Sequence, residues 1–173
     1  MRKTLLVAFL FITPMIQAQT DEIHKHSGEI IKGKVVRVQD TTLDFMYDNE
    51  DAVNELSKYA VEKIVYGKSG RVEEVSNRIV INSEKDWERV LILEDLSFIS
   101  GLKRLNEIKG KTSFINYHTG NTGDRKAEKK LKMEAAKMGA QFILMTSDRS
   151  TVGGSSNQLG GTQAIKKGVA YKY

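Results

Sequence analysis

The first 18 residues have the layout of a secretory signal peptide, which limits how much chain is left to fold and where it folds. Arg2 and Lys3 form a short basic region, and an apolar run of about a dozen residues extends from Leu5 to Ile16. The small residue Ala18 stands at the expected cleavage point. This apolar run is shorter than the ~20 residues that a membrane span needs. We therefore expect cleavage near Ala18 and a mature protein of about 155 residues, periplasmic or secreted.

The absence of cysteine narrows the ways in which this protein can be stabilised. It excludes disulfides, a thiolate metal site and a lipid-modified cysteine at the cleavage point. No later stretch approaches 18 apolar residues, so we expect no segment that spans a membrane. Stability must then come from packed apolar cores, which contribute little when a domain is small.

Charge is divided unevenly along the chain. Residues 19–82 carry 9 Lys and Arg against 12 Asp and Glu, whereas residues 83–173 carry 16 against 10. This asymmetry is typical of a basic contact surface. One interpretation is a solvated basic surface with no specific partner. The alternative for an exported protein is that it contacts an envelope protein, a polysaccharide or acidic lipid head groups, and the compartment argues against nucleic acid. The residues predicted to interact are Lys129, Lys130, Lys166 and Lys167.

Residues 20–81 have the pattern of a small β domain. The segments 29–39 and 42–47 are rich in branched and aromatic residues, and 42–47 alternates apolar with polar positions. Shorter strands are expected within residues 21–26, 61–67 and 71–76. Because five short strands would otherwise leave open edges, we expect a small five-stranded barrel or a curled sheet.

Residues 83–173 predict a second domain, a β-sheet with one principal helix. The apolar repeat of residues 124–138 predicts that helix, with Asp124 as its N-cap and Gly139 just after its end. Strands are expected at residues 87–93, 105–117, 142–146 and 168–173, and a Gly/Ser-rich loop at 147–163. The fold class expected for the whole chain is therefore α+β.

Two segments resemble known families. Over about 60 residues, the order GEIIKGKVVRV, TLDFMY, an acidic loop and KIVYGKSGRV resembles the small Sm-like or SH3-like barrels of exported bacterial proteins. Residues 87–173, with NEIKGKTSF, LKMEAAKMGAQFILM and GVAYKY, resemble the YbjQ-type small α/β domain. The periplasmic domain of the Rcs envelope stress-sensor lipoprotein is similar to that family. Its lipidated cysteine and disulfides are absent from this chain.

The second resemblance also bears on assembly and on metal binding. Some YbjQ-type domains form rings, which implies that a homo-oligomer is possible. Some are described as binding heavy metals, but this chain has no cysteine to hold a soft metal.

Histidines are the candidate metal ligands. His24 and His26 are two residues apart, and on a regular strand such residues share a face. A third ligand would come from Glu22 or from the distant His118. His118 would also have to be the general base for any serine nucleophile in the second half of the chain. Residues 97–101, around the serine considered there, lack the first glycine of a nucleophile elbow.

These patterns identify no catalytic residue and no cofactor-binding residue. They favour an exported, non-enzymatic binding or envelope-interaction module without a cofactor. One alternative is a metal-binding or hydrolytic envelope enzyme that uses His24, His26 or His118. Another is a structural homo-oligomer.

Overall fold

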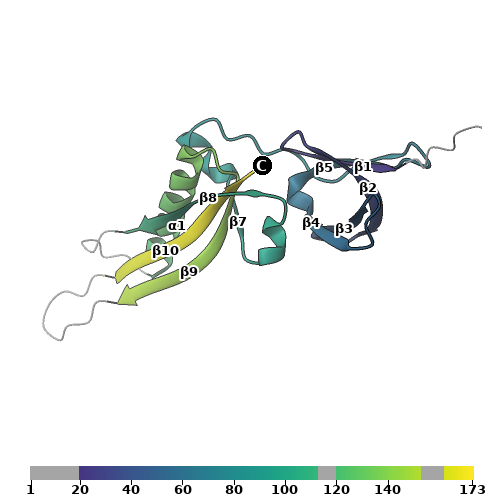
Figure 1. Cartoon of the computed structure of the whole chain (residues 1–173). Helices are drawn as coiled ribbons and strands as arrows, with labels where there is room; N and C mark the ends of the chain where they lie inside the picture. Colours follow the sequence, from purple (N-terminus) through teal and green to yellow (C-terminus); the bar gives the residue numbers. More distant parts are fainter. Residues whose placement is uncertain (1–19, 113–119, 153–161) are drawn as a thin grey trace, which may run out of the picture.

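The chain forms two β-sheets and one main helix (Figure 1). The computed structural model describes residues 20–112, 120–152 and 162–173. The strand order is β4-β3-β2-β1-β5-β6 in the first sheet and β7-β9-β10-β8 in the second. The α+β class is confirmed. A closed five-stranded barrel is not seen, because the first sheet has six strands and its edge strands β4 and β6 do not pair with each other.

The first sheet is antiparallel throughout. Its strands are β1 (Asp21–Lys25), β2 (Ile30–Val38), β3 (Thr42–Tyr47), β4 (Val53–Ser57), β5 (Val61–Val65) and β6 (Val72–Glu74), and the 3₁₀ turn η1 (Lys58–Ala60) joins β4 to β5. The expected segments coincide with five of these strands. Strand β4 was not expected, and it is the additional strand that makes six.

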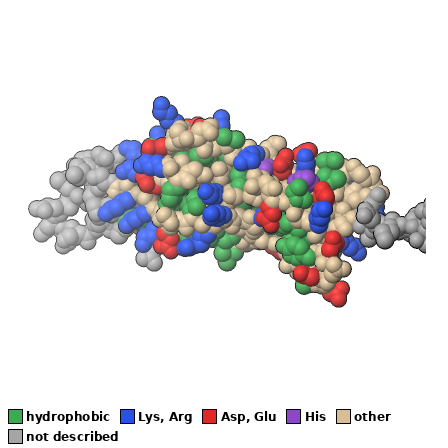
Figure 2. Space-filling view, turned by 45° about the horizontal axis from the view of Figure 1, so that its top comes forward, with side chains coloured by type: hydrophobic (Ala, Val, Ile, Leu, Met, Phe, Trp, Pro, Cys, Tyr) green, Lys and Arg blue, Asp and Glu red, His purple; other side chains and the backbone are tan. Residues whose placement is uncertain are grey.

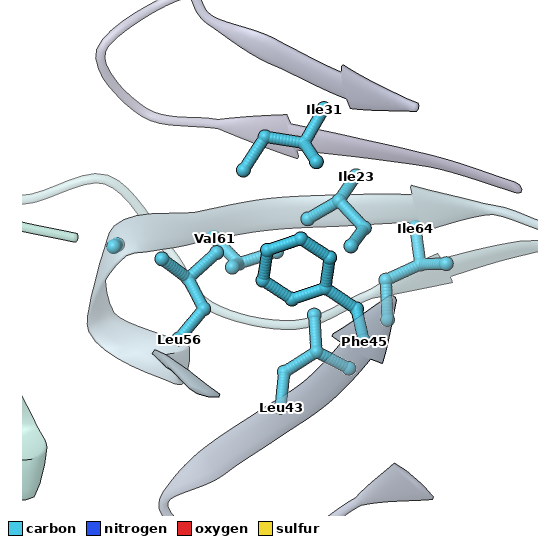
Figure 3. Packing of buried hydrophobic residues seen from close by; sticks show 8 residues of the cluster. Ile23, Ile31, Leu43, Phe45, Leu56, Val61 and Ile64 are labelled. Carbon is cyan, nitrogen blue, oxygen red and sulfur yellow. The ribbon is translucent and has the colours of Figure 1, made fainter. Parts of the chain in front are cut away.

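The first sheet curls around one apolar core. Phe45 of β3 lies among side chains from β1, β2, β4 and β5 (Figure 3). The fully buried members of this core include Ile23, Leu43, Val61 and Ile64. Burying such side chains contributes about 2 kcal/mol each, which is how a cysteine-free sheet of this size is stabilised.

The second sheet includes one parallel pair, β7 with β9, and is otherwise antiparallel. Its elements are η2 (Glu84–Arg89), β7 (Leu91–Leu93), η3 (Leu96–Ile99), β8 (Lys103–Lys111), α1 (Gly120–Lys137), β9 (Phe142–Val152) and β10 (Thr162–Lys172). All strands of the first sheet precede residue 82, and all strands of the second follow it. Within the described residues, no helix combines the length and apolar character required to cross a membrane.

Three expectations for the second half were wrong in detail. Residues 87–93 form a short strand only from Leu91, because a capping box between Ser83 and Asp86 starts the 3₁₀ turn η2. Helix α1 begins at Gly120, so Asp124 lies inside it and is not its N-cap. Residues 147–152 and 162–163 belong to strands β9 and β10 and not to a loop. The expected signal peptide, His118 and most of that loop lie outside the described residues. These undescribed ranges are 1–19, 113–119 and 153–161.

Helix α1 packs against one face of the second sheet (Figure 1). Leu131 and Ala135 are fully buried on this face, beside Ile108 of β8 and Ile143 of β9. The approach is closest at Gly110, where an added Cβ would lie 1.9 Å from the carbonyl oxygen of Ala127. Small residues therefore determine how near the helix lies to strand β8.

Candidate functional site

The second sheet has a face that α1 does not cover. Ile108 and Gly110 of β8 face the helix, so the alternate residues Lys109 and Lys111 lie on the opposite face. Both of these lysines are exposed.

Strand β10 adds to the same surface. Lys167 is the direct cross-strand partner of Lys109, and Ile165 is the partner of Lys111. Directly paired residues of an antiparallel sheet project to the same side. We call the surface formed by Lys109, Lys111, Ile165 and Lys167 the basic face.

The basic face places two like charges directly opposite each other. Lys109 and Lys167 are both exposed, and within the described residues neither forms an ion pair. Like charges at directly opposed strand positions destabilise a sheet. An anion bound between the two ammonium groups would remove that repulsion, so the arrangement is suited to an anionic partner.

The four predicted lysines have different environments. Lys129 lies with its Nζ 4.9 Å from the centre of the Trp87 ring. Lys130 donates from Nζ to the carbonyl oxygen of Lys111 at 2.9 Å, beside the basic face. Lys166 is buried, and its Nζ lies 2.6 Å from a carboxylate oxygen of Asp148. Lys167 alone among the four belongs to the basic face.

The charge asymmetry of the sequence is visible in the folded chain. Figure 2 shows Lys and Arg side chains gathered over the left half of the molecule, the side of the second sheet. Sequence reasoning missed Lys109 and Lys111, although the alternation of residues 107–111 carried a signal. Glu107, Lys109 and Lys111 are charged, and the intervening positions are Ile108 and Gly110.

The rest of the uncovered face packs against the first half of the chain. Phe142 of β9 and Tyr173 are in contact, with ring centres 5.4 Å apart. Tyr59 of η1 lies 5.5 Å from Phe142, and its ring also meets Phe98 of η3 at 6.0 Å. We call this aromatic contact between the sheets, together with His26 beyond Tyr173, the junction.

His26 lies at the edge of the junction and is almost fully buried, with 2 % of its surface exposed. Its ring centre is 4.7 Å from that of Tyr173, and its Nε2 is 2.9 Å from Ser76 Oγ. Ser76 Oγ donates its single hydrogen to the Val61 carbonyl oxygen at 2.7 Å. Nε2 of His26 must therefore be the donor to Ser76.

This direction of hydrogen bonding does not suit nucleophilic catalysis. A serine nucleophile needs a histidine that accepts its proton, whereas here Ser76 gives its proton to a carbonyl oxygen. His26 Nδ1, where an orienting carboxylate would be expected, is buried without a hydrogen-bond partner in the described part of the chain. The His26–Ser76 contact is accordingly a structural one.

His24 and His26 have separate partners. Strand β1 ends at Lys25, so His26 lies beyond the strand whose alternation would place both histidines on one face. His24 Nε2 lies 3.4 Å from a carboxylate oxygen of Glu22, while His26 faces Ser76 and Tyr173. Among the described residues there is no group of three or more His, Asp or Glu that could hold a metal ion.

Known proteins do not supply a function for this arrangement. Comparisons with protein-family models, with curated proteins and with solved structures found no match. The barrel-like and YbjQ-type resemblances remain predictions. Function has to be argued from the geometry of the basic face and the junction.

Acid is expected to destabilise the junction through His26. Burial lowers the pKa of His26 below 6.5, and the Arg78 charge lowers it further, against opposing effects of the Glu62 charge and of the Ser76 backbone. Below about pH 6.5 the unfolded chain therefore binds a proton more readily than the folded chain. The free energy of unfolding consequently decreases as the pH is lowered. Urea unfolding between about pH 7.5 and about pH 5 measures this slope.

The variant for this pH experiment is His26→Phe. It keeps a ring beside Tyr173 but cannot titrate, so its acid dependence should be shallower than that of the wild type. Equal slopes for the wild type and His26→Phe would contradict the assignment.

Proposed function

We propose that this chain is an exported, non-enzymatic binding module whose basic face contacts anionic lipid head groups at an envelope membrane. The observation that carries the proposal is the opposed pair Lys109 and Lys167 on an uncovered sheet face. The signal-peptide layout of residues 1–18 supports the location, and the excess of Lys and Arg over residues 83–173 supports the sign of the partner.

Several properties of the basic face favour a head-group layer over an acidic protein. Lysine ammonium groups are compact, mobile charges that do not require the planar geometry of an arginine–carboxylate pair. A sheet face with lysines at successive outward positions suits a layer of diffuse negative charge. Ile165 is half-buried, lies directly opposite Lys111, and gives an apolar contact of the kind found at membrane surfaces.

Vesicle binding tests the proposal. The protein should co-sediment with vesicles containing roughly a third of phosphatidylglycerol and not with pure phosphatidylcholine. Each lysine near an anionic surface contributes about 1 kcal/mol, so Lys109→Gln/Lys167→Gln should weaken binding by about thirtyfold. Raising salt from about 0.05 M to about 0.5 M should weaken wild-type binding as well, because salt screens exposed charges.

A second double variant controls for net charge. Lys34→Gln/Lys68→Gln also removes two exposed lysines, but from the first half of the chain, and should leave vesicle binding within about twofold of wild type. An equal loss of vesicle binding in both double variants would show that overall charge explains the effect. It would contradict the proposal that the basic face is the binding surface. Binding to soluble polyglutamate but not to vesicles would identify an acidic protein as the partner and overturn the lipid assignment.

A further inference from the structure

A cavity of about 460 Å³ opens on the first sheet, at the start of β1. Its lining includes Asp21, Lys34, Val35, Asp48, Tyr66 and Lys68. The volume lies within the roughly 300–1,000 Å³ that small-molecule sites occupy. This cavity is separate from the basic face, which belongs to the second sheet.

One wall of the cavity is held in place by a fixed carboxylate. Asp21 Oδ2 accepts a hydrogen bond from the backbone N–H of Val35 at 3.0 Å. Asp21 Oδ1 accepts one from the backbone N–H of Gly67, also at 3.0 Å. Asp21 therefore joins β1 to β2 and to the turn after β5. Both of its oxygens are engaged by the protein itself.

A second wall is apolar and held in position. Val35 and Tyr66 both pack against the core of the first sheet. The Tyr66 hydroxyl donates to a carboxylate oxygen of Glu73 at 2.9 Å, and the Arg71 guanidinium lies 4.2 Å from the centre of the ring. The tyrosine ring is thus fixed before any ligand arrives, which lowers the cost of binding.

Two cationic side chains complete the lining. Lys34 and Lys68 are exposed, and neither forms an ion pair within the described part of the chain. Asp48 also lines the cavity, but no ion pair joins it to either lysine. The lining thus carries two positive and two negative charges. Both oxygens of Asp21 already accept backbone hydrogen bonds, so Lys34 and Lys68 are the charged groups left to bind an anion.

We propose that this cavity binds a small organic carboxylate. Its apolar body would lie against Val35 and Tyr66, and its carboxylate would be held by Lys34 and Lys68. Apolar walls with a few convergent charged groups are the usual composition of a small-molecule site.

Three probes of similar size and different charge test the proposal: benzoate, benzyl alcohol and benzylamine. The protein is used as exported, with its N-terminus determined by mass spectrometry, and ¹⁵N NMR follows the titrations. Benzoate should shift the amide resonances of Asp21, Val35 and Tyr66, with an affinity about tenfold above that of the alcohol. Benzylamine should bind no better than the alcohol.

The lysine variants separate this site from the basic face. Lys34→Gln/Lys68→Gln should weaken benzoate binding about tenfold and leave benzyl alcohol unchanged. Lys109→Gln/Lys167→Gln should leave benzoate binding unchanged, so the cavity and the vesicle proposal can fail separately. Equal affinity for all three probes, or shifts confined to residues outside the cavity, would overturn the assignment.

Discussion

Replacing Gly110 by alanine is expected to lower the free energy of unfolding by about 3 kcal/mol or more. The new Cβ would lie 1.9 Å from the carbonyl oxygen of Ala127 and 2.8 Å from the backbone nitrogen of Leu131. Both atoms belong to the backbone of α1, so no side chain can rotate aside. The helix would have to move away from β8 and uncover Ile108. Urea or thermal unfolding followed by circular dichroism measures the loss.

Gly123→Ala is the matched control, since it makes the same chemical change within α1. Among the described residues, an added Cβ there would meet only the Cβ of Ala164, at 3.6 Å, which is ordinary contact. Alanine favours a helix over glycine by about 0.5–1 kcal/mol, so this variant should be as stable as the wild type or more stable. If Gly110→Ala were also neutral, the close helix packing described above would be wrong.

Replacing Tyr173 by alanine is expected to cost about 3 kcal/mol and to loosen the junction before either sheet unfolds. The change removes ring contacts with His26 and Phe142. It also removes the hydroxyl oxygen that accepts the backbone N–H of Ile79 at 2.9 Å. Amide hydrogen exchange should speed up at His26 and Ile79 while Ile64 and Ile143, buried in the two cores, stay protected.

Tyr173→Phe separates the ring from the hydroxyl. It keeps the packing with Phe142 and leaves only the Ile79 N–H without its acceptor, which should cost about 1 kcal/mol. Exchange should then accelerate at Ile79 more than at His26. Uniform acceleration across both sheets in Tyr173→Ala would show that the junction and the two sheets unfold as one unit.

The elements that could be predicted from the sequence are those that carry their signal locally. Strand β3 was predicted with its observed bounds because Leu43, Phe45 and Tyr47 alternate with other residues over a short run. Strand β4 was missed because VNELS contains little of that pattern and Val53 is exposed. The residues from Trp87 to Leu93 look apolar enough for a strand, but the capping box upstream starts a 3₁₀ turn first.

The sites depend on contacts that one sequence does not reveal. Lys109 and Lys167 become neighbours only through the register of β8 against β10. Ser76 lies 50 residues from His26 along the chain, and nothing in either local pattern links the two. The expectation that His24 and His26 share a face required β1 to continue to His26, and the strand ends one residue earlier, at Lys25.

The junction also orders the steps by which the chain reaches its native state. Ile79 and Tyr173, the donor and acceptor of one junction hydrogen bond, are separated by 94 positions in the sequence. Synthesis runs from the N-terminus, so the first sheet is made before Tyr173, the residue that contacts His26 and Ile79. Until β9 has been made, Tyr59 also lacks its contact with the Phe142 ring. Chains interrupted before Tyr173 would leave His26 and Ile79 without that partner, and proteases could distinguish them from finished molecules.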